Sequence, residues 1–464
     1  MSTNPRAPLP GDSVYHPTLV GPDIFHKTGG VLQGQGAPLV IADYDSAVRS
    51  KSISLTRRKL LQGAGVLLAQ SAVPAYVRAA DTQSTAAIAP TSSIPRNENV
   101  EYGQDTLRAG IRSRIIDNNN GLKMHILEAG FEDRDRPCII LLHGFPELAY
   151  TWRSQLPALA QAGFHVVAPD MRGYGRSVKT PVTYDDDVSR YSRMNLVSDV
   201  VGLVRALGYA KVAAVVGHDW GSPVAAWCAL MRPDVFQSVV LVSTPFGRPR
   251  KAAAGIDIDR DLAALPRPRK HYSSYWATRA ANDDMWRAPQ GVHDLLRALY
   301  YFKSADWKGN KPFPLKSWTA PELAKMPEYY VMDLDKTTAQ TMAAVMPSEA
   351  QIAACKWMSE KDLQVYSAEY MRTGFQGGLD YYRGDLTASA ARTIDVPACY
   401  IAGASEWGVY QTPGAFEAMQ HGACTRLLGV HLVKDAGHSV VEEQSEEVNR
   451  LLIDFLRQAK TKES

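Results

Sequence analysis

From about residue 100 onward, short apolar runs alternate with longer segments in which apolar residues recur at helical spacing. Several of the short runs are rich in Val and Ile and continuous, which is typical of strands buried on both faces of a sheet. The pattern predicts strands at residues 123–127, 138–142, 165–168, 212–216, 239–242 and 398–401, and helices at 154–162 and 194–207. This alternation predicts an α/β fold with a mostly parallel central sheet and helices on both faces.

The alternation stops after Pro245, and a strand returns only after Pro397. The intervening segment carries aromatic, proline and charged residues with mainly helical spacing. We therefore expect one core in two parts, residues 99–244 and 391–464, with a mainly helical cap at residues 245–390 inserted between them.

Residues 1–98 have a different character and are expected to form an N-terminal extension. Arg57 and Arg58 precede a modest apolar stretch that ends in small residues, and residues 81–98 are rich in Ala, Thr, Ser and Pro. The arginine pair with its apolar stretch resembles a twin-arginine export signal, followed by a linker. This resemblance implies the twin-arginine export machinery as a partner and a periplasmic or secreted protein. The long stretch before the arginines keeps a cytoplasmic location open.

Composition narrows the class of protein further. The chain has 464 residues, 51 basic and 48 acidic side chains and a formal net charge of +3. Such a balance indicates neither a nucleic-acid partner nor an anionic membrane surface. No apolar run reaches the roughly 20 residues that span a bilayer, so we expect no integral membrane span. The five cysteines are scattered, and their odd number excludes a fully paired set of disulfides within one chain.

The clearest chemical signal is the sequence Gly-His-Asp-Trp-Gly at residues 217–221. It lies between a predicted strand and a helix-like run at 223–231, which is the context of a nucleophile elbow. The elbow needs its glycines because the turn is tight and packs closely against backbone. Its central residue is Asp219 rather than the usual serine. A carboxylate is already charged at neutral pH, so Asp219 can attack a saturated carbon directly and form an alkyl–enzyme ester.

Two further loops fit the same architecture. The sequence His-Gly-Phe-Pro-Glu at residues 143–147 follows a predicted strand, where this fold places one half of an oxyanion hole. We expect the backbone N–H groups of Phe145 and Trp220 to form that hole, and Phe145, Pro146 and Trp220 to contact the substrate. Residues 170–175 are interpreted as a structural turn near the site.

A base and its orienting acid are expected near the end of the chain. His438 follows the apolar run 427–433, where this architecture places a histidine that activates water. Glu406 follows the strand predicted at 398–401, and the order Asp, Glu, His matches the order of nucleophile, acid and base in this fold. Asp435 is the weaker alternative for the acid, because it is close to His438 in sequence.

Together these segments resemble the soluble epoxide hydrolases of the α/β-hydrolase superfamily, over roughly residues 100–458. The resemblance implies an Asp nucleophile, a His base, an orienting acid and two cap tyrosines. Residues 271–276 resemble the first tyrosine motif, with Tyr272 in the active position, and residues 377–383 resemble the second, with Tyr382. Family members more often carry Asn-Trp-Tyr-Arg in the second motif and Asp at the position of Glu406.

The resemblance implies an enzyme that adds water to a small, apolar epoxide to give a diol, with no metal and no organic cofactor. A phenol stays protonated at neutral pH and can give a proton to the oxygen of the opening ring. Two alternatives stay open. A haloalkane dehalogenase shares the Asp–His chemistry but typically has Asn at the position of Phe145, and a ligand-binding homologue would keep the fold without turnover. The sequence does not reveal the particular epoxide, the selectivity or the oligomeric state.

Overall fold

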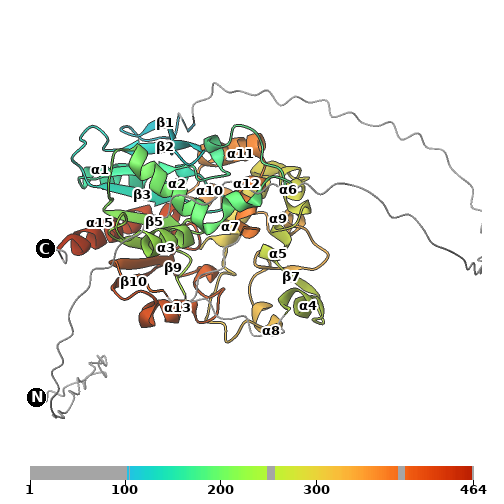
Figure 1. The fold of residues 1–464 in the computed structure, drawn as a ribbon. Coiled ribbons are helices and arrows are strands. Elements are labelled where there is room, and N and C mark those ends of the chain that lie inside the picture. Colours follow the sequence, from blue (N-terminus) through green and yellow to red (C-terminus); the bar gives the residue numbers. More distant parts are fainter. Residues whose placement is uncertain (1–101, 104, 248–256, 385–391, 462–464) are drawn as a thin grey trace, which may run out of the picture. The chain divides into compact units, whose positions relative to one another are not determined.

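The computed structural model describes residues 102–103, 105–247, 257–384 and 392–461 (Figure 1). The expected extension and export signal, residues 1–98, lie outside the described residues. The fold is built on an eight-stranded sheet with the strand order β1-β2-β4-β3-β5-β6-β9-β10. The strands are β1 (Arg112–Asp117), β2 (Lys123–Ala129), β3 (Cys138–Leu142), β4 (His165–Pro169), β5 (Ala214–His218), β6 (Val239–Val242), β9 (Ala398–Gly403) and β10 (Leu427–Val433).

Six neighbouring strands of this sheet are parallel to one another: β4, β3, β5, β6, β9 and β10. Strand β2 is antiparallel to both β4 and β1. Strands β3, β4, β5, β6 and β9 are buried along their whole length, as their continuous apolar runs predicted. Strand β1 was not predicted. It is an edge strand whose side chains are largely exposed, so it carries no buried apolar run that the sequence could reveal.

Helices flank the sheet (Figure 1). Helix α1 packs on α15, and α2 packs on α3, which also contacts β5 and β6. The helices and short helical turns of the core are η1 (Ala149–Trp152), α1 (Gln155–Gln161), η2 (Gly175–Ser177), η3 (Val188–Tyr191), α2 (Arg193–Ala206), α3 (Gly221–Met231), η5 (Trp407–Val409), α13 (Ala415–Ala418), η6 (Met419–Ala423), α14 (Val440–Glu443) and α15 (Ser445–Thr461). This arrangement confirms the α/β-hydrolase fold expected from the sequence.

A second set of elements lies in the chain between β6 and β9, on one side of the sheet in Figure 1. Most are helices, but β7 and β8 pair as a small antiparallel sheet that the sequence did not predict. Three-residue strands are too short to show a periodicity. The elements are α4 (Ile258–Ala263), β7 (Arg269–His271), α5 (Tyr272–Trp276), α6 (Ala280–Trp286), α7 (Gly291–Lys303), α8 (Ala320–Leu323), β8 (Val331–Asp333), α9 (Thr338–Ala343), α10 (Glu349–Ala354), α11 (Glu360–Thr373), α12 (Gln376–Leu379) and η4 (Asp380–Tyr382).

The topology decides where chemistry can occur. Because β3, β5, β6 and β9 are parallel neighbours, their carboxyl ends meet at one edge of the sheet. The loops that follow these strands carry the motifs found in the sequence.

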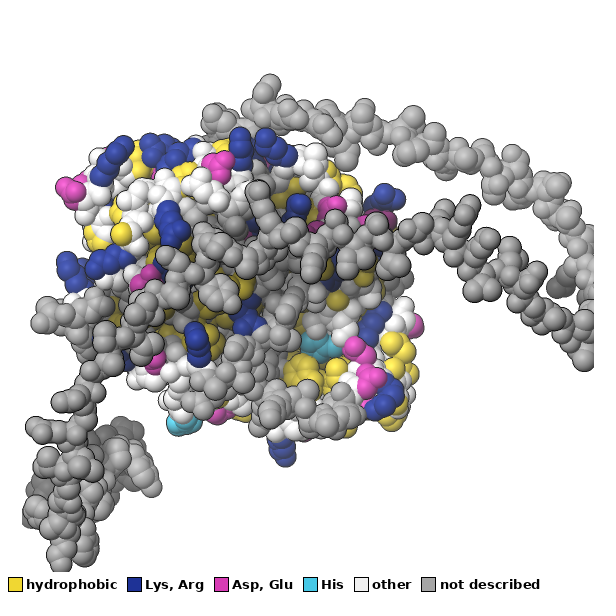
Figure 2. Space-filling model, in the orientation of Figure 1, with side chains coloured by type: hydrophobic (Ala, Val, Ile, Leu, Met, Phe, Trp, Pro, Cys, Tyr) yellow, Lys and Arg dark blue, Asp and Glu magenta, His cyan; other side chains and the backbone are white. Residues whose placement is uncertain are grey.

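On the face drawn in Figure 2, basic and acidic side chains lie scattered over the described surface. Within the described ranges, no helix combines the length and apolarity needed to cross a membrane.

Candidate active site

Asp219 occupies the sharp turn between β5 and α3. Its φ of 48° lies in the left-handed region, which residues other than glycine rarely adopt. A Cβ atom on Gly217 would lie 1.9 Å from the carbonyl oxygen of Gly221, and a Cβ on Gly221 would lie 2.2 Å from that of Leu142. The glycines are therefore required by the close approach of backbone, and the turn presents Asp219 at the sheet edge.

The loop after β3 holds the Asp219 carboxylate from one side. The backbone N–H of Phe145 donates a hydrogen bond to Asp219 Oδ1, with an N···O distance of 2.9 Å. A Cβ on Gly144 would lie 2.3 Å from the Cβ of Asp219, so only glycine leaves room for the nucleophile. Trp220 lies at the start of α3, where the first N–H groups have no partner within the helix. The loop and the helix start can together stabilise negative charge on Asp219.

His438 faces the nucleophile from the loop after β10. Its Nδ1 lies 2.6 Å from Glu406 Oε1, and its Nε2 lies 3.4 Å from Asp219 Oδ2. Because the carboxylate of Glu406 only accepts hydrogen bonds, Nδ1 carries the proton and Nε2 keeps its lone pair. Asp435, the weaker alternative for the acid, is exposed to solvent. The structure thus brings Asp219, His438 and Glu406 into one chain of contacts.

Burial controls the ionisation of this group. The side chains of His438 and Glu406 are only 7% and 1% exposed, whereas that of Asp219 is 16% exposed. Burial, with the nearby charge of Lys303, lowers the pKa of His438 well below its usual value. Burial also raises the pKa of Glu406 to about 7, although the hydrogen bond from Ser243 acts in the opposite direction and lowers it. His438 is therefore neutral at physiological pH, which is the state of a base.

Tyr272 and Tyr382 lie close together near the nucleophile. Their ring centres are 5.9 Å apart with planes at 79°, and the ring of Tyr382 lies 5.0 Å from that of Trp220. Burial raises the pKa of both phenols, and the negative charge of Asp219 raises it further. Both tyrosines therefore keep their protons as hydrogen-bond donors. The Tyr272 hydroxyl also lies 3.5 Å from Gln411 Oε1.

An aromatic wall surrounds the two phenols. Trp276 is buried, and its ring lies 4.8 Å from Tyr272, 5.2 Å from Tyr382 and 5.1 Å from Phe145. Pro146 is held nearby, because its carbonyl oxygen accepts a 2.6 Å hydrogen bond from the hydroxyl of Tyr300. These contacts make the surroundings of the tyrosines suited to a hydrocarbon group.

Comparison with known proteins is consistent with this geometry. Residues 137–444 match the family model described as alpha/beta hydrolase fold. The chain is 33% identical over 369 residues to Epoxide hydrolase B of Mycobacterium tuberculosis (strain ATCC 25618 / H37Rv), which covers 74% of this chain and 97% of the relative. It is 32% identical to an epoxide hydrolase of Caballeronia sordidicola, over 73% of this chain and 92% of that protein. A solved epoxide hydrolase from an endophytic Streptomyces is 31% identical with a TM-score of 0.62, covering 76% of this chain and 97% of that one.

The chain belongs to the epoxide hydrolase family.

In this family member the acid position is adapted to a glutamate. The longer side chain of Glu406 reaches His438, and a Cβ on Gly408 would lie 2.4 Å from Glu406 Oε1. The lack of a side chain at Gly408 therefore leaves room for the carboxylate of Glu406. The departure noted in the sequence is accommodated within the acid loop.

Ser243 is a site residue that the sequence did not single out. It follows β6 with a φ of 75°, and its hydroxyl donates a short hydrogen bond to Glu406 Oε1. Ser243 Oγ also lies 3.4 Å from Nδ1 of His438. A serine after an apolar run is common, so no signal in the sequence marked this residue. Only the pairing of β6 with β9 brings it beside Glu406.

Glu147 and His218 were part of the recognised motifs but had no assigned role. His218 Nδ1 lies 2.9 Å from Glu147 Oε2, and its Nε2 lies 2.7 Å from the carbonyl oxygen of His438. Burial alone would lower the pKa of His218, but the carboxylate of Glu147 raises it to about 9. Burial would raise the pKa of Glu147, but His218 lowers it to about 2. The resulting ion pair ties three loops of the site together.

Ligand atoms of Glu147, His218 and His438 lie within 4.8 Å of one another, and no other such group occurs among the described residues. Both nitrogens of His218 are already engaged, by Glu147 and by a backbone carbonyl. Those of His438 face Glu406 and Asp219. These three residues are therefore a hydrogen-bonded network, and their chemistry does not fit a metal site.

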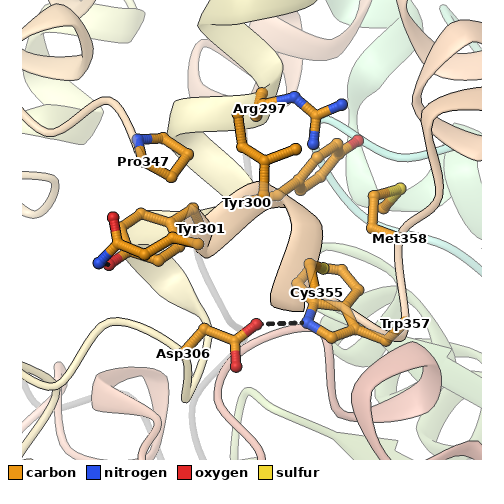
Figure 3. Close-up of a pocket in the computed structure, with 10 residues that line it drawn as sticks. Arg297, Tyr300, Tyr301, Asp306, Pro347, Cys355, Trp357 and Met358 are labelled. Atoms are coloured by element: carbon orange, nitrogen blue, oxygen red, sulfur yellow. Dashed lines mark hydrogen bonds between the residues drawn. The ribbon is translucent and has the colours of Figure 1, made fainter. Parts of the chain in front are cut away.

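A separate hollow lies within the elements between β6 and β9 (Figure 3). It is lined by the end of α7 and by α10, and the indole N–H of Trp357 donates a 3.0 Å hydrogen bond to Asp306 beside it. Tyr301 and Cys355 also face it. None of the predicted site residues lines this hollow, so it is distinct from the site around the nucleophile.

Proposed function

We propose that this chain hydrolyses epoxides to vicinal diols through a covalent ester on Asp219. The observation that carries the proposal is the position of one carboxylate. Asp219 Oδ1 accepts the N–H of Phe145 at 2.9 Å, while Oδ2 lies 3.4 Å from His438 Nε2. A nucleophile, an oxyanion donor and a base therefore surround the same side chain, and membership of the epoxide hydrolase family agrees with that chemistry.

In the first step, Tyr272 and Tyr382 hold the epoxide oxygen by hydrogen bonds. Asp219 Oδ2 attacks a ring carbon, because Oδ1 is occupied by the N–H of Phe145. The bond between that carbon and the ring oxygen breaks, and the oxygen takes a proton from one of the phenols. This step yields a hydroxyalkyl ester and a tyrosinate. No base is needed in this step, because a carboxylate attacks without losing a proton.

In the second step, Nε2 of His438 takes a proton from water, and the hydroxide attacks the carboxyl carbon of Asp219. The negative charge that develops on Oδ1 is stabilised by the backbone N–H groups of Phe145 and Trp220. Glu406 stabilises the imidazolium through Nδ1. The bond between the carboxyl carbon and Oδ2 then breaks, and the leaving alkoxide takes the proton of the newly formed carboxylic acid, which gives the diol and restores the carboxylate. The proton on His438 returns to the tyrosinate through solvent.

A haloalkane dehalogenase would use the same nucleophile and base, but a departing halide needs no proton. Two phenols that keep their protons beside Asp219, and Phe145 where dehalogenases typically carry Asn, support the epoxide. Measuring diol formation and halide release with matched substrates separates the two functions. Loss of diol formation in Asp219→Ala would exclude the non-catalytic homologue.

The covalent step is tested by a single turnover in ¹⁸O-labelled water with excess enzyme, followed by mass spectrometry of the peptide that contains Asp219. We expect one labelled oxygen in the Asp219 carboxylate, because water attacks the ester carbonyl rather than the substrate carbon. If only the diol is labelled, the ester mechanism is wrong.

We also propose export through the twin-arginine route. The signal itself is known only from the sequence, since Arg57 and Arg58 lie outside the described residues. The five cysteines are free thiols in the structure, which suits a route that carries folded proteins. N-terminal sequencing of protein recovered outside the cytoplasm tests the proposal, and an intact Met1 in that fraction contradicts cleavage.

A further inference from the structure

Glu443 is a glutamate beside the active site that has no part in the proposed reaction. It is the last residue of α14, shortly after His438 and the loop 434–439 that carries it, which we call the histidine loop. Its carboxylate accepts three backbone hydrogen bonds: Oε2 from Ala305 at 2.8 Å and from Gly437 at 2.9 Å, and Oε1 from Ser439 at 3.1 Å. Gly437 and Ser439 flank His438, so one carboxylate holds the chain directly before and after the base.

The third donor, Ala305, belongs to the segment that follows α7. This segment is itself fixed in place by Asn310, which is buried. The amide of Asn310 donates to the carbonyl oxygens of Phe302 at 2.9 Å and Ser304 at 2.8 Å. Glu443 therefore ties the histidine loop to a rigid part of the chain that lies outside the loop.

The other contacts of the histidine loop point the same way. The N–H of His438 donates to the carbonyl oxygen of Lys303, the last residue of α7, at 2.9 Å. A Cβ on Gly437 would lie 2.5 Å from that same oxygen, so the two backbones are in direct contact. The N–H groups of three consecutive residues, 437–439, thus all bind acceptors that lie on α7 or are bound to the segment after it.

A base needs this kind of support because its task is geometric. Nε2 of His438 must stay beside the Asp219 ester to direct a water onto the carboxyl carbon, and a displacement of about 1 Å can slow such a step about a hundredfold. Glu406 holds only the far nitrogen of the imidazole ring. The position of the backbone that carries the ring depends on the N–H contacts of the loop.

We propose that Glu443 is a positioning residue for the base, whose carboxylate fixes the backbone on both sides of His438 against the segment after α7. This inference rests on the proposed function and adds to it the group that keeps Nε2 aligned with the Asp219 ester. Hydrogen bonds to a charged acceptor are roughly twice as strong as those to a neutral one, so the charge on Glu443 sets the strength of the contact.

That charge changes close to neutral pH. Burial of the carboxyl group, with the negative charges of Asp306 and Glu406, raises the pKa of Glu443 to about 8, although the N–H groups of Ala305 and Gly437 lower it. The other charged or titratable groups on the packed elements are Arg153 after η1, Lys303 and Lys308 at and after the end of α7, and Lys434, Asp435 and His438 in the histidine loop. The hold on His438 should therefore tighten as the pH rises through about 8.

The test follows the ester on the Asp219 peptide by rapid quench and mass spectrometry in the wild type, Glu443→Gln and Glu443→Asp, across a pH series. Gln keeps the shape of the side chain, removes its charge and turns an NH2 group toward the N–H donors. Asp keeps the charge on a side chain too short to reach all three donors. Glu446→Gln controls for loss of a charge, because Glu446 is exposed in the first turn of α15. Gln444→Ala controls for loosening of the same loop, because Gln444 donates to the carbonyl oxygen of Asp435.

At about pH 9, ester hydrolysis in Glu443→Gln should be slower by about ten- to hundredfold, while ester formation is unchanged because Asp219 attacks without the base. The rise of the hydrolysis rate through about pH 8 should be absent in Glu443→Gln. The rise through about pH 7, which ionisation of Glu406 causes, should remain. Glu443→Asp should regain part of the rate, and both controls should match the wild type in both steps.

The inference is wrong if Glu443→Gln slows ester formation and ester hydrolysis equally, or if it keeps the rise near pH 8. It is also wrong if Gln444→Ala slows hydrolysis as much as Glu443→Gln does. Should Glu443→Gln not fold, Glu443→Asp decides, because hydrolysis as fast as in the wild type would overturn the inference. Failure of the proposed function looks different, since no ester would then form on the Asp219 peptide in any of these proteins.

Discussion

Replacement of Ser243 by alanine tests how the buried acid of this site is kept ionised. Glu406 Oε1 accepts hydrogen bonds from both Ser243 Oγ and His438 Nδ1, and among the described residues Glu406 Oε2 has no partner. Burial already raises the pKa of Glu406 to about 7, and the Ser243 hydroxyl opposes that rise. A hydrogen bond to a charged group contributes about 1.5–3 kcal/mol, and one pKa unit corresponds to about 1.4 kcal/mol. Ser243→Ala should therefore raise the pKa of Glu406 by about one to two units.

The direction of the effect on activity follows from the sign of this shift. A carboxyl group with a raised pKa is ionised only at higher pH, and only the ionised form stabilises the imidazolium of His438. We expect hydrolysis of the ester in Ser243→Ala to be slower by about ten- to hundredfold near neutral pH and to recover at alkaline pH. Formation of the ester should be unchanged, because attack by Asp219 needs neither His438 nor Glu406.

The assay follows the ester on the Asp219 peptide by rapid quench and mass spectrometry across a pH series, which separates ester formation from its hydrolysis. Ser243→Gly is a second variant, because glycine accepts the φ of 75° and also lacks the hydroxyl. Ser238→Ala is the matched control, since the buried Ser238 donates its hydroxyl to Ala213 just before the same strand. In a variant that also carries Glu406→Gln, Ser243→Ala should not change the pH dependence of ester hydrolysis, because glutamine has no carboxyl group to titrate. The reasoning is refuted if Ser243→Ala slows ester formation and ester hydrolysis equally. It is also refuted if the rate of ester hydrolysis falls at the same acidic pH in Ser243→Ala as in the wild type.

Three further predictions concern the rest of the site. Tyr272→Phe and Tyr382→Phe should each slow ester formation about ten- to hundredfold, and the double variant should show almost none, in single-turnover assays; unchanged rates would show that the phenols do not donate to the ring oxygen. His438→Ala should form one equivalent of ester per site and then stop, so a steady release of diol would contradict the role of His438. Glu147→Gln should lower the free energy of unfolding by about 3–5 kcal/mol in urea, because it leaves a buried His218 without its charge partner. The difference in the free energy of unfolding between the wild type and Glu147→Gln should be largest between about pH 4.5 and 6.5. It should shrink as the pH rises through about 9, the raised pKa of His218, and as the pH falls through about 2, the lowered pKa of Glu147. A difference that is constant with pH would contradict the ion pair.

The sequence by itself determined the fold class and singled out the residue that we propose as the nucleophile. Asp219 was predictable because the elbow imposes its constraints within five consecutive residues, where only glycine fits on either side of the turn. The buried strands were predictable for a similar reason, since burial on both faces requires a continuous apolar run. His438 and the two cap tyrosines were named from local motifs and a family resemblance.

The order of motifs already favoured Glu406 over Asp435 as the acid, but only the tertiary structure showed the contact between Glu406 and His438 and brought Ser243 and Lys303 to the site. Ser243 and Lys303 come from segments far apart in the chain, and neither carries a local pattern that distinguishes it from an ordinary serine or lysine. Their importance arises from burial and from the charges around them, which set pKa values and leave Lys303 without a carboxylate partner among the described residues. Backbone constraints involve residues that are neighbours in the sequence, so they can be recognised from the sequence alone. The electrostatic environment of a side chain forms only after distant segments have packed together.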